Sequence, residues 1–462
     1  MVKAENIILK PVAYPQVDVP TELPELSDAV YQARLENVLK MMAEQALDCL
    51  FIYADREHYT NFEYLSGFDL RFEEALLMLS ANGEATYILG NECLPLASLS
   101  RIPAQVELYQ AFSLPSQPID ALRPLSAIVA GHGLKSGDHV GMVGWKLMAP
   151  RYARRDVFDI PQFILQEIGQ VAGTGALINV TDAFIDPAYG LRVLNTADDI
   201  AYFEYGAAWA SIGLRDMLDS LETGVSELAI SRRMRIGAMT ENSHPLTVVG
   251  KNNDAGMVYP GNTILRLGDR FNCSLGLRGG LSCRTGYLAY SSEDIDPDKR
   301  DYIDVLAKPY YAAVVNWYEN IRIGASCGDI YDMVEAALPK VQFHWKLNTG
   351  HYVAAEEWLS SPFEHGSTVK IRSGMCVQVD IIPSMDGYAG ANCEDGIAIA
   401  DADMRREIQE RFPRVWTRIE ARRRHMIDVL KINIADEVLP LSNLAATYRP
   451  YMLNKDMALA VH

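Results

Sequence analysis

The sequence predicts an α/β domain in the first part of the chain and a second domain of helices and strands behind it. The 462 residues are too many for a single hydrophobic core. Apolar stretches of strand length alternate with helix-like stretches from about residue 31 to residue 144, which is typical of α/β proteins. The stretch 180–195 looks like a connector. We therefore expect domains at 1–190 and 195–440, followed by a short tail at 441–462.

The elements of the first domain follow in order. Residues 1–30 are rich in proline and are expected to form an irregular arm. An amphipathic helix is predicted from about residue 31, and it leads into an apolar strand at 49–53. Further strands are expected at 75–80, 86–89 and 139–144, with a helical stretch near 118–132. No GxGxxG motif accompanies these elements, so no dinucleotide site is expected.

The second domain begins with a predicted helix. Thr196 is placed to cap its N-terminus, acidic residues occupy the first turn, and Gly224 marks its end. Strands are expected between residues 245 and 290. Further helices are predicted at 226–240, 296–322, 328–338 and 403–433. The last of these carries an arginine cluster at 422–424, which we interpret as a solvent-exposed face.

Composition narrows the class of ligand. The formal net charge of −18 argues against nucleic acid and anionic membranes as partners, because both require a basic surface. No stretch approaches the roughly 18 consecutive apolar residues of a membrane span, and we predict a cytoplasmic protein. The seven cysteines are scattered and lack CxxC spacing, which argues against a disulfide framework and a structural zinc site. The expected ligand is a small molecule or a short peptide.

The strongest functional signal surrounds an apolar strand, CVQVDII, that begins at Cys376. Alternation places Cys376, Gln378 and Asp380 on one face and the valines on the other. A carboxylate in such a strand is costly unless it is paired, bound to a ligand or used in a reaction. His351 precedes the strand and Glu394 follows it, and a resemblance to a known enzyme family implies that these two residues and Asp380 form a site. Among the cysteines, Cys376 is the one candidate nucleophile, and a buried thiol is the alternative.

The order of His351, the Gly-Met pair at 374–375, Asp380 and Glu394 resembles the C-terminal half of the pita-bread family. This family includes aminopeptidase P, prolidase, methionine aminopeptidase and creatinase. The resemblance implies an α+β pita-bread domain over residues 195–440.

The first domain resembles the creatinase-type N-terminal domain. The resemblance lies in the element Leu-Ser-Gly-Phe at 65–68 and in the charged loop that follows it. In family members with this architecture, the N-terminal domain of one subunit helps to close the active site of its partner. The resemblance therefore implies a homodimer and makes Arg71 a candidate substrate contact, with a solvated loop arginine as the alternative.

Metal-dependent members of the family hold two divalent ions with Asp, Asp, His, Glu and Glu, and a water bound between the ions becomes the nucleophile. In this chain the stretch GDRFNCSLG places Ser274 at the first ligand position. The second ligand position falls on Thr285, or on Arg284 in the alternative alignment. The remaining three ligand positions fall on His351, Asp380 and Glu394, and Asp380 stands where a glutamate is usual.

The accessory histidines of the peptidases are also replaced. Met257 stands near the expected position of one of them, and Trp358 stands at the position of the other. These replacements argue against a dinuclear metal centre, and no cofactor is expected. The alternative is a single divalent ion held by His351, Asp380 and Glu394.

The first hypothesis for function is a metal-independent, creatinase-like hydrolase, or a related enzyme that cleaves a C–N or similar bond. Its substrate would be small, polar and carboxylate-bearing. His351 would be the general acid/base, and Asp380 and Glu394 would orient it. The alternatives are a non-catalytic protein that binds a metabolite or peptide in the pita-bread cavity, and a metal-dependent Xaa-Pro peptidase.

Substrate contacts are predicted at the former ligand positions and in the loops around them. Ser274, Thr285 and Arg284 would favour an anionic or hydrogen-bonding substrate, and Arg284 is the expected partner of a carboxylate. Trp358 and Arg71 complete the predicted set of contacts.

Overall fold

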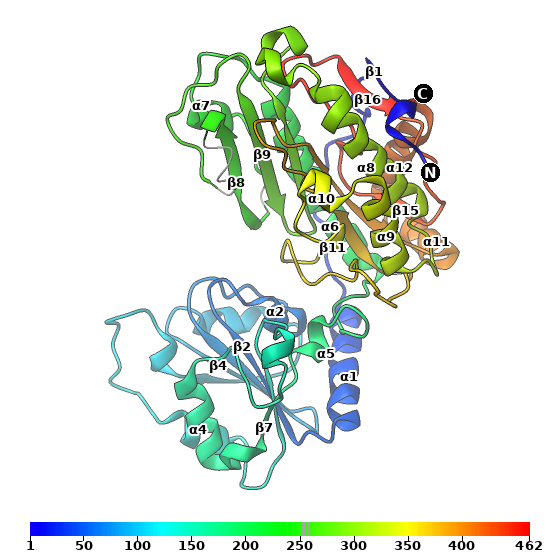
Figure 1. Ribbon diagram of the computed structural model, residues 1–462. Coiled ribbons are helices and arrows are strands. Elements are labelled where there is room, and N and C mark those ends of the chain that lie inside the picture. The colour runs from blue at the N-terminus through cyan, green and yellow to red at the C-terminus, as the bar shows by residue number, and fades with distance from the viewer. Residues whose placement is uncertain (238, 252–255, 257) are drawn as a thin grey trace. The chain divides into compact units, whose positions relative to one another are not determined.

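The computed structural model describes residues 1–237, 239–251, 256 and 258–462 (Figure 1). The chain forms two compact units, Leu26–Val193 and a larger unit made of Met1–Glu25 and Leu194–His462. The division after Val193 lies in the predicted connector. The predicted assignment of the two chain ends is corrected, because the N-terminal arm and the C-terminal tail both belong to the larger unit.

The smaller unit contains a six-stranded mixed sheet with strand order β5-β4-β3-β2-β6-β7. The strands are β2 (Cys49–Ala54), β3 (Ala75–Ser80), β4 (Ala85–Leu89), β5 (Gln105–Leu108), β6 (Val140–Val143) and β7 (Leu177–Asn179). The helices are α1 (Asp28–Glu44), α2 (Thr60–Ser66), α3 (Leu125–Gly131), α4 (Gln162–Ala172) and α5 (Asp182–Ile185). All residues of β2 are buried, as expected for a central strand covered on both faces. The predicted α/β class is confirmed.

The larger unit is built around two four-stranded antiparallel sheets, with strand orders β13-β10-β9-β8 and β11-β12-β14-β15. Their strands are β8 (Glu241–Val249), β9 (Arg270–Leu277), β10 (Gly280–Tyr287), β11 (Gly350–Tyr352), β12 (Cys376–Val379), β13 (Asn392–Glu394), β14 (Gly396–Ile399) and β15 (Val438–Pro440). Only Asp395 separates β13 from β14, so one extended segment passes from the first sheet into the second. The two sheets and the helices that cover them agree with the α+β class predicted for this domain.

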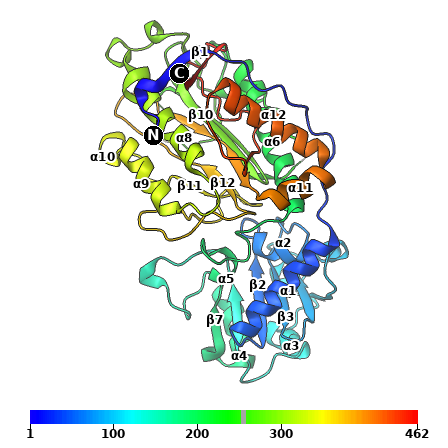
Figure 2. The same cartoon turned by 90° about the vertical axis from the view of Figure 1, so that its right-hand side faces the viewer.

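Helices cover these sheets. They are α6 (Ala197–Asp219), α7 (Glu227–Ser231), α8 (Lys308–Asn320), α9 (Cys327–Ala337), α10 (Lys340–Phe343), α11 (Ala402–Arg411) and α12 (Pro413–Arg424). The α6 helix packs against β9 and β10, and apolar residues of α6 and β9 share one buried core. The α11 and α12 helices lie beside α6 (Figure 2).

Several predicted helices end earlier or are interrupted for identifiable reasons. The Thr196 side chain accepts from the backbone N–H of Asp199, which confirms the predicted N-cap, but α6 ends at Asp219. The helix predicted at 403–433 is broken at Phe412, because Pro413 opens a new helix. The helix predicted at 226–240 is the short α7.

The two ends of the described chain are tied to the larger unit. Strand β1 (Ile7–Pro11) pairs in antiparallel fashion with β16 (Met457–Val461), and the two lie side by side in Figure 1. Next to this pair, the buried side chain of Asn316 binds the backbone of Val2 twice. Its Oδ1 accepts from the N–H at 2.8 Å, and its Nδ2 donates to the carbonyl oxygen at 2.7 Å. One amide side chain on α8 therefore holds the first residues in place.

Replacing Asn316 with alanine should lower the free energy of unfolding by about 1–3 kcal/mol, because two hydrogen bonds and a buried contact are lost together. Urea unfolding followed by circular dichroism measures the loss. Lys3→Ala is the matched control, since the Lys3 side chain is exposed beside the same strand. Equal unfolding midpoints for the Asn316 and Lys3 variants would contradict the assignment.

Candidate active site

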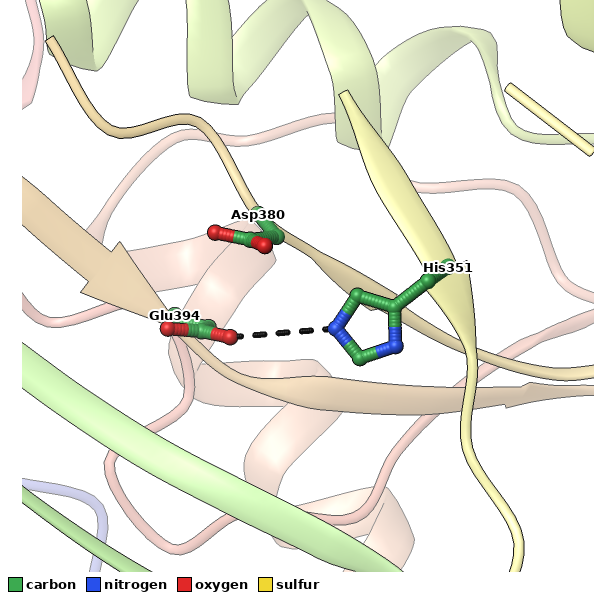
Figure 3. A group of neighbouring side chains, drawn as sticks. All are labelled: His351, Asp380 and Glu394. Atoms are coloured by element: carbon green, nitrogen blue, oxygen red, sulfur yellow. Dashed lines mark ion pairs between the residues drawn. The ribbon is translucent and has the colours of Figure 1, made fainter. Parts of the chain in front are cut away.

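Three neighbouring strand segments bring His351, Asp380 and Glu394 together (Figure 3). His351 lies in β11, Asp380 directly follows β12, and Glu394 ends β13. One potential ligand atom of each residue lies within 4.8 Å of the others, and all three side chains are buried. The cluster has the composition that the sequence predicts, while the catalytic roles of its members stay predictions.

The imidazole of His351 is oriented by its neighbour in the chain. Nδ1 lies 3.1 Å from the carbonyl oxygen of Tyr352, and a carbonyl oxygen can only accept, so Nδ1 carries a proton. Nε2 lies 3.2 Å from Oε1 of Glu357 and 3.9 Å from Oε1 of Glu394. Nε2 is therefore the atom that can exchange a proton or bind a cation. Glu357 is a member of the site that the sequence pattern did not indicate.

Burial and mutual repulsion change the protonation of the acids and the imidazole. Burial raises the pKa of Asp380 well above its ordinary value, and the negative charge of Glu394 raises it further. Burial also raises the pKa of Glu394, against the lowering effect of its contact with His351. Burial opposes the protonation of His351, but Glu357, Glu394 and Asp380 together raise its pKa well above the ordinary value. Such perturbed groups are typical of functional sites.

Gln378 fixes the two carboxylates that face Nε2 of the histidine. Its Oε1 accepts from the backbone N–H of Leu281 at 3.0 Å, which determines the orientation of the amide. Its Nε2 donates to Oε1 of Glu394 at 2.7 Å and to Oε1 of Glu357 at 3.3 Å. Gln378 also lies directly opposite His351 in the register of β11 and β12, so its backbone adjoins the histidine while its side chain connects the two carboxylates.

The sheet that carries Glu394 presents two rows of side chains on one face. The members of each row lie directly opposite one another on β9, β10 and β13. Residues that lie directly opposite one another on antiparallel strands point to the same face of the sheet. The first row is Ser274, Cys283 and Glu394, and the second is Asn272, Thr285 and Asn392. These six residues are called the polar rows below. Both former ligand positions, Ser274 and Thr285, thus share the face of Glu394.

The register places Arg284 on the opposite face, which corrects its prediction as a substrate contact. Its Nη2 donates to Oδ2 of Asp395 at 2.6 Å, and its Nε donates to the carbonyl oxygen of Thr447 at 3.0 Å. Its Nη1 donates to the carbonyl oxygens of Cys283 and Glu394. The buried guanidinium is therefore fully engaged in holding the sheet from behind. The alternation was visible in the sequence, but the correct alignment of the second ligand position was not.

Trp358 covers the imidazole. Its ring stacks on that of His351 with centroids 4.2 Å apart and an angle of 18° between the planes, and it is 39% exposed. An indole face favours a protonated imidazole.

Arg71 belongs to the smaller unit, where its guanidinium lies 5.6 Å from the ring centre of Tyr59, so its role as a substrate contact stays a prediction. Met257, the position of a replaced histidine, lies outside the described residues.

The cysteine that shares a face with Glu394 is Cys283, which the sequence analysis did not select. Burial, followed by the charge of Glu394, raises its pKa well above the ordinary value. Burial also raises the pKa of Cys376, the predicted candidate, and its next cause is Asp199 rather than the site. Both thiols are therefore protonated at neutral pH, and neither has the electropositive surroundings of a nucleophilic thiolate.

The residues present fit one divalent ion but not two. Oδ1 of Asp380 is buried and has no hydrogen-bond partner among the described residues, which leaves it free to bind a cation. With Nε2 of His351 and a carboxylate oxygen of Glu394 it offers three ligands of the kind that zinc, manganese or iron accepts. The hydroxyls of Ser274 and Thr285 cannot supply the charge of the two carboxylates needed for a second ion.

Comparisons with known proteins agree with this architecture. The family model for metallopeptidase family M24 matches residues 202–401, and the model for the creatinase/prolidase N-terminal domain matches residues 34–143. A search of curated protein sequences finds no match. Within the part of the chain that the structure describes, no helix combines the length and the apolar character needed to cross a membrane.

Solved structures with the same fold cover most of the chain. An Xaa-Pro dipeptidase from Bacillus anthracis has 14% identity and a TM-score of 0.61, over 81% of this chain and 96% of the other. A prolidase from Thermococcus sibiricus has 15% identity and a TM-score of 0.64, over 82% and 95%. An X-Pro aminopeptidase from Thermotoga maritima has 12% identity and a TM-score of 0.60, over 79% and 95%. The chain belongs to the pita-bread family, in which a creatinase/prolidase N-terminal domain precedes a metallopeptidase family M24 domain.

Proposed function

We propose that this protein is a hydrolase of small polar substrates that cleaves a C–N or related bond without a bound metal ion. One observation carries the proposal. His351 presents Nε2 to two carboxylates, whereas Ser274 and Thr285 occupy the positions from which the metal-dependent relatives would bind a second ion. The site thus keeps acid/base groups and has lost the ligands of a bimetallic nucleophile.

The mechanism follows from the protonation states. His351 is held as an imidazolium by Glu357 and Glu394, and it would donate its Nε2 proton to the leaving nitrogen as the C–N bond breaks. A carboxylate with a raised pKa is a stronger base than an ordinary one when it is ionised, so Glu394, which its contact with His351 helps to keep ionised, would take the proton of the attacking water. The hydroxide equivalent joins the carbon atom and the proton leaves with the nitrogen, so the reaction consumes one water.

The carboxylate-bearing substrate of the first hypothesis loses its main support, because Arg284 is bound to Asp395 on the other face. The described side chains around Nε2 are instead acidic. A polar substrate with hydrogen-bond donors fits these groups better than an anion does.

The second candidate is a hydrolase that uses one divalent ion, and the unpartnered Oδ1 of Asp380 favours it. His351, Asp380 and Glu394 would hold the ion, which would polarise a substrate oxygen and lower the pKa of a bound water. The substrates named for the similar structures, Xaa-Pro peptides, belong with this candidate. A third candidate, a non-catalytic binding protein, uses the same buried polar groups to hold a ligand. A homodimer and a cytoplasmic location stay predictions.

Metal analysis separates the first two candidates. Protein purified without chelator should hold well below about one equivalent of manganese, iron, cobalt or zinc, even after incubation with excess ions. It should also hydrolyse a member of a panel of small amides, amidines and dipeptides in the presence of EDTA. The double variant Ser274→Asp/Thr285→Asp restores two carboxylates and should bind more metal than the wild type. Stoichiometric metal in the wild type, with activity lost on chelation, would establish the one-ion enzyme instead.

A further inference from the structure

The polar rows contain buried polar atoms that the protein itself does not use. Oγ of Ser274 and Oδ1 of Asn392 are inaccessible to solvent and have no hydrogen-bond partner among the described residues. The two residues are 1% and 2% exposed. A buried polar atom without a partner costs about 1–3 kcal/mol, so two of them on one face, beside Oδ1 of Asp380, indicate a place where a ligand supplies the missing bonds.

The orientation of Asn392 is determined by its neighbour. Its Nδ2 lies 3.3 Å from Oε2 of Glu394, and a carboxylate can only accept, so Nδ2 is the atom that faces Glu394. Its Oδ1 is consequently an acceptor that remains open. In the same row, Oγ1 of Thr285 donates to Oδ1 of Asn272 at 2.9 Å, which leaves the lone pairs of Thr285 as acceptors.

The atoms of this face that can still form a hydrogen bond are therefore mainly acceptors. Asn392 and Thr285 accept, Asp380 accepts when it is ionised, and Ser274 offers a hydroxyl that can donate or accept. Charge favours the same kind of ligand, because Glu394 belongs to the polar rows, Asp380 lies close to Glu394, and Arg284 is turned away. A complementary ligand carries several N–H donors and a positive charge.

We propose that Ser274 and Asn392 form a subsite for an amide-like N–H group of the substrate, next to carboxylates that bind a cationic nitrogen of the same molecule. The substrate class is thus a small amino amide or a similar donor-rich cation. This inference rests on the proposed function for the reaction, but the subsite itself is a binding property and is tested as one.

Two probes differ in the amide N–H donors that the subsite would recognise. Glycinamide carries an ammonium group and an amide with two N–H donors, and N,N-dimethylglycinamide keeps the ammonium group and the carbonyl but lacks the amide donors. Isothermal titration calorimetry in EDTA, which removes metal-mediated binding, should give a dissociation constant about tenfold lower for glycinamide.

Two serine variants make the test specific. Ser274→Ala removes a hydroxyl that has no partner among the described residues, so the unfolding midpoint should stay equal or rise while glycinamide binding weakens about fivefold. Ser282→Ala is the matched control on the neighbouring strand. Ser282 is equally buried, but its Oγ donates to Asp395 on the opposite face at 3.0 Å. The control should lose stability and keep the tenfold preference for glycinamide.

Asn392→Ala should reduce the preference between the two probes to about twofold or less. Equal affinity of the wild type for both probes, binding only when a divalent ion is present, or no binding of either probe at millimolar concentration would each overturn the subsite. Discrimination between the probes without hydrolysis of any amide in the panel would instead keep the subsite and reject the proposed hydrolase.

Discussion

Replacing His351 with glutamine is expected to lower kcat by about 10²–10⁴-fold, the usual contribution of a positioned general acid or base. Glutamine can fill much of the space and donate a hydrogen bond to a carboxylate, but it cannot transfer a proton. The side chain is fully buried and its Nε2 faces Glu357 and Glu394. Steady-state kinetics on a hydrolysed member of the panel measures the loss, and the metal content of the variant should equal that of the wild type.

His425 supplies a matched control in the same unit. It is also a buried histidine, but its Nε2 contacts Oγ1 of Thr447 at 2.9 Å, and burial lowers its pKa to about 4. It is therefore neutral at physiological pH, whereas His351 is held as a cation by its acids. His425→Gln should reduce stability and leave kcat within about twofold. A normal kcat for His351→Gln, with the fold intact by circular dichroism, would remove the histidine from the reaction.

The parts of the site that could be predicted from sequence are those set by local spacing. His351, Asp380 and Glu394 lie close together as the family resemblance implies, because each sits in or directly after a short strand, β11, β12 or β13. The family pattern likewise selected Ser274, which shares the face of Glu394. The strand register then shows which of Thr285 and Arg284 lies on the face of Glu394. Thr285 lies opposite Asn392, on that face, and Arg284 lies opposite Cys393, on the other face.

Contacts made by loops could not be predicted in this way. Glu357 reaches the histidine from a segment without regular structure, and neither periodicity nor spacing distinguishes it from Glu356. Trp358 was selected for its position in the family pattern, and its stacking on the imidazole is a property of the folded loop. Side chains on loops are positioned by the scaffold, so their partners appear only in the structure.

The burial of the arginine cluster at 422–424 is a second feature that could not be predicted from the sequence, and it concerns stability. The sequence favoured a solvent-exposed face for residues 422–424, yet Arg422 is fully buried and Arg423 is 7% exposed. The partner that makes this burial tolerable is Glu204 on α6, which is 218 residues away from Arg422 in the sequence. A run of like charges is usually solvated, and only a distant acid on a packed helix reverses that expectation.

Removing this acid should produce the largest loss of stability in the molecule. Glu204 is fully buried, and its Oε1 accepts from Nε of Arg418 at 2.9 Å and from Nη2 of Arg422 at 2.6 Å. Glu204→Gln keeps the shape but leaves two buried guanidinium groups without a counter-charge, which typically costs about 3–5 kcal/mol. Urea unfolding of the variant measures the change in the free energy of unfolding.

Two comparisons show whether charge or packing causes this loss. Asp403→Asn breaks an exposed ion pair with Arg406 on the adjacent α11 and should cost less than about 0.5 kcal/mol. The triple variant Glu204→Leu/Arg418→Met/Arg422→Met replaces the whole buried set with apolar groups of similar size, and it should recover most of the stability, since the desolvation of three charges is removed together. If Glu204→Gln cost no more than the exposed control, water would have to reach the two arginines. If the triple variant were as unstable as Glu204→Gln, the packing of α6 against α12, and not the charge, would be the source of the loss.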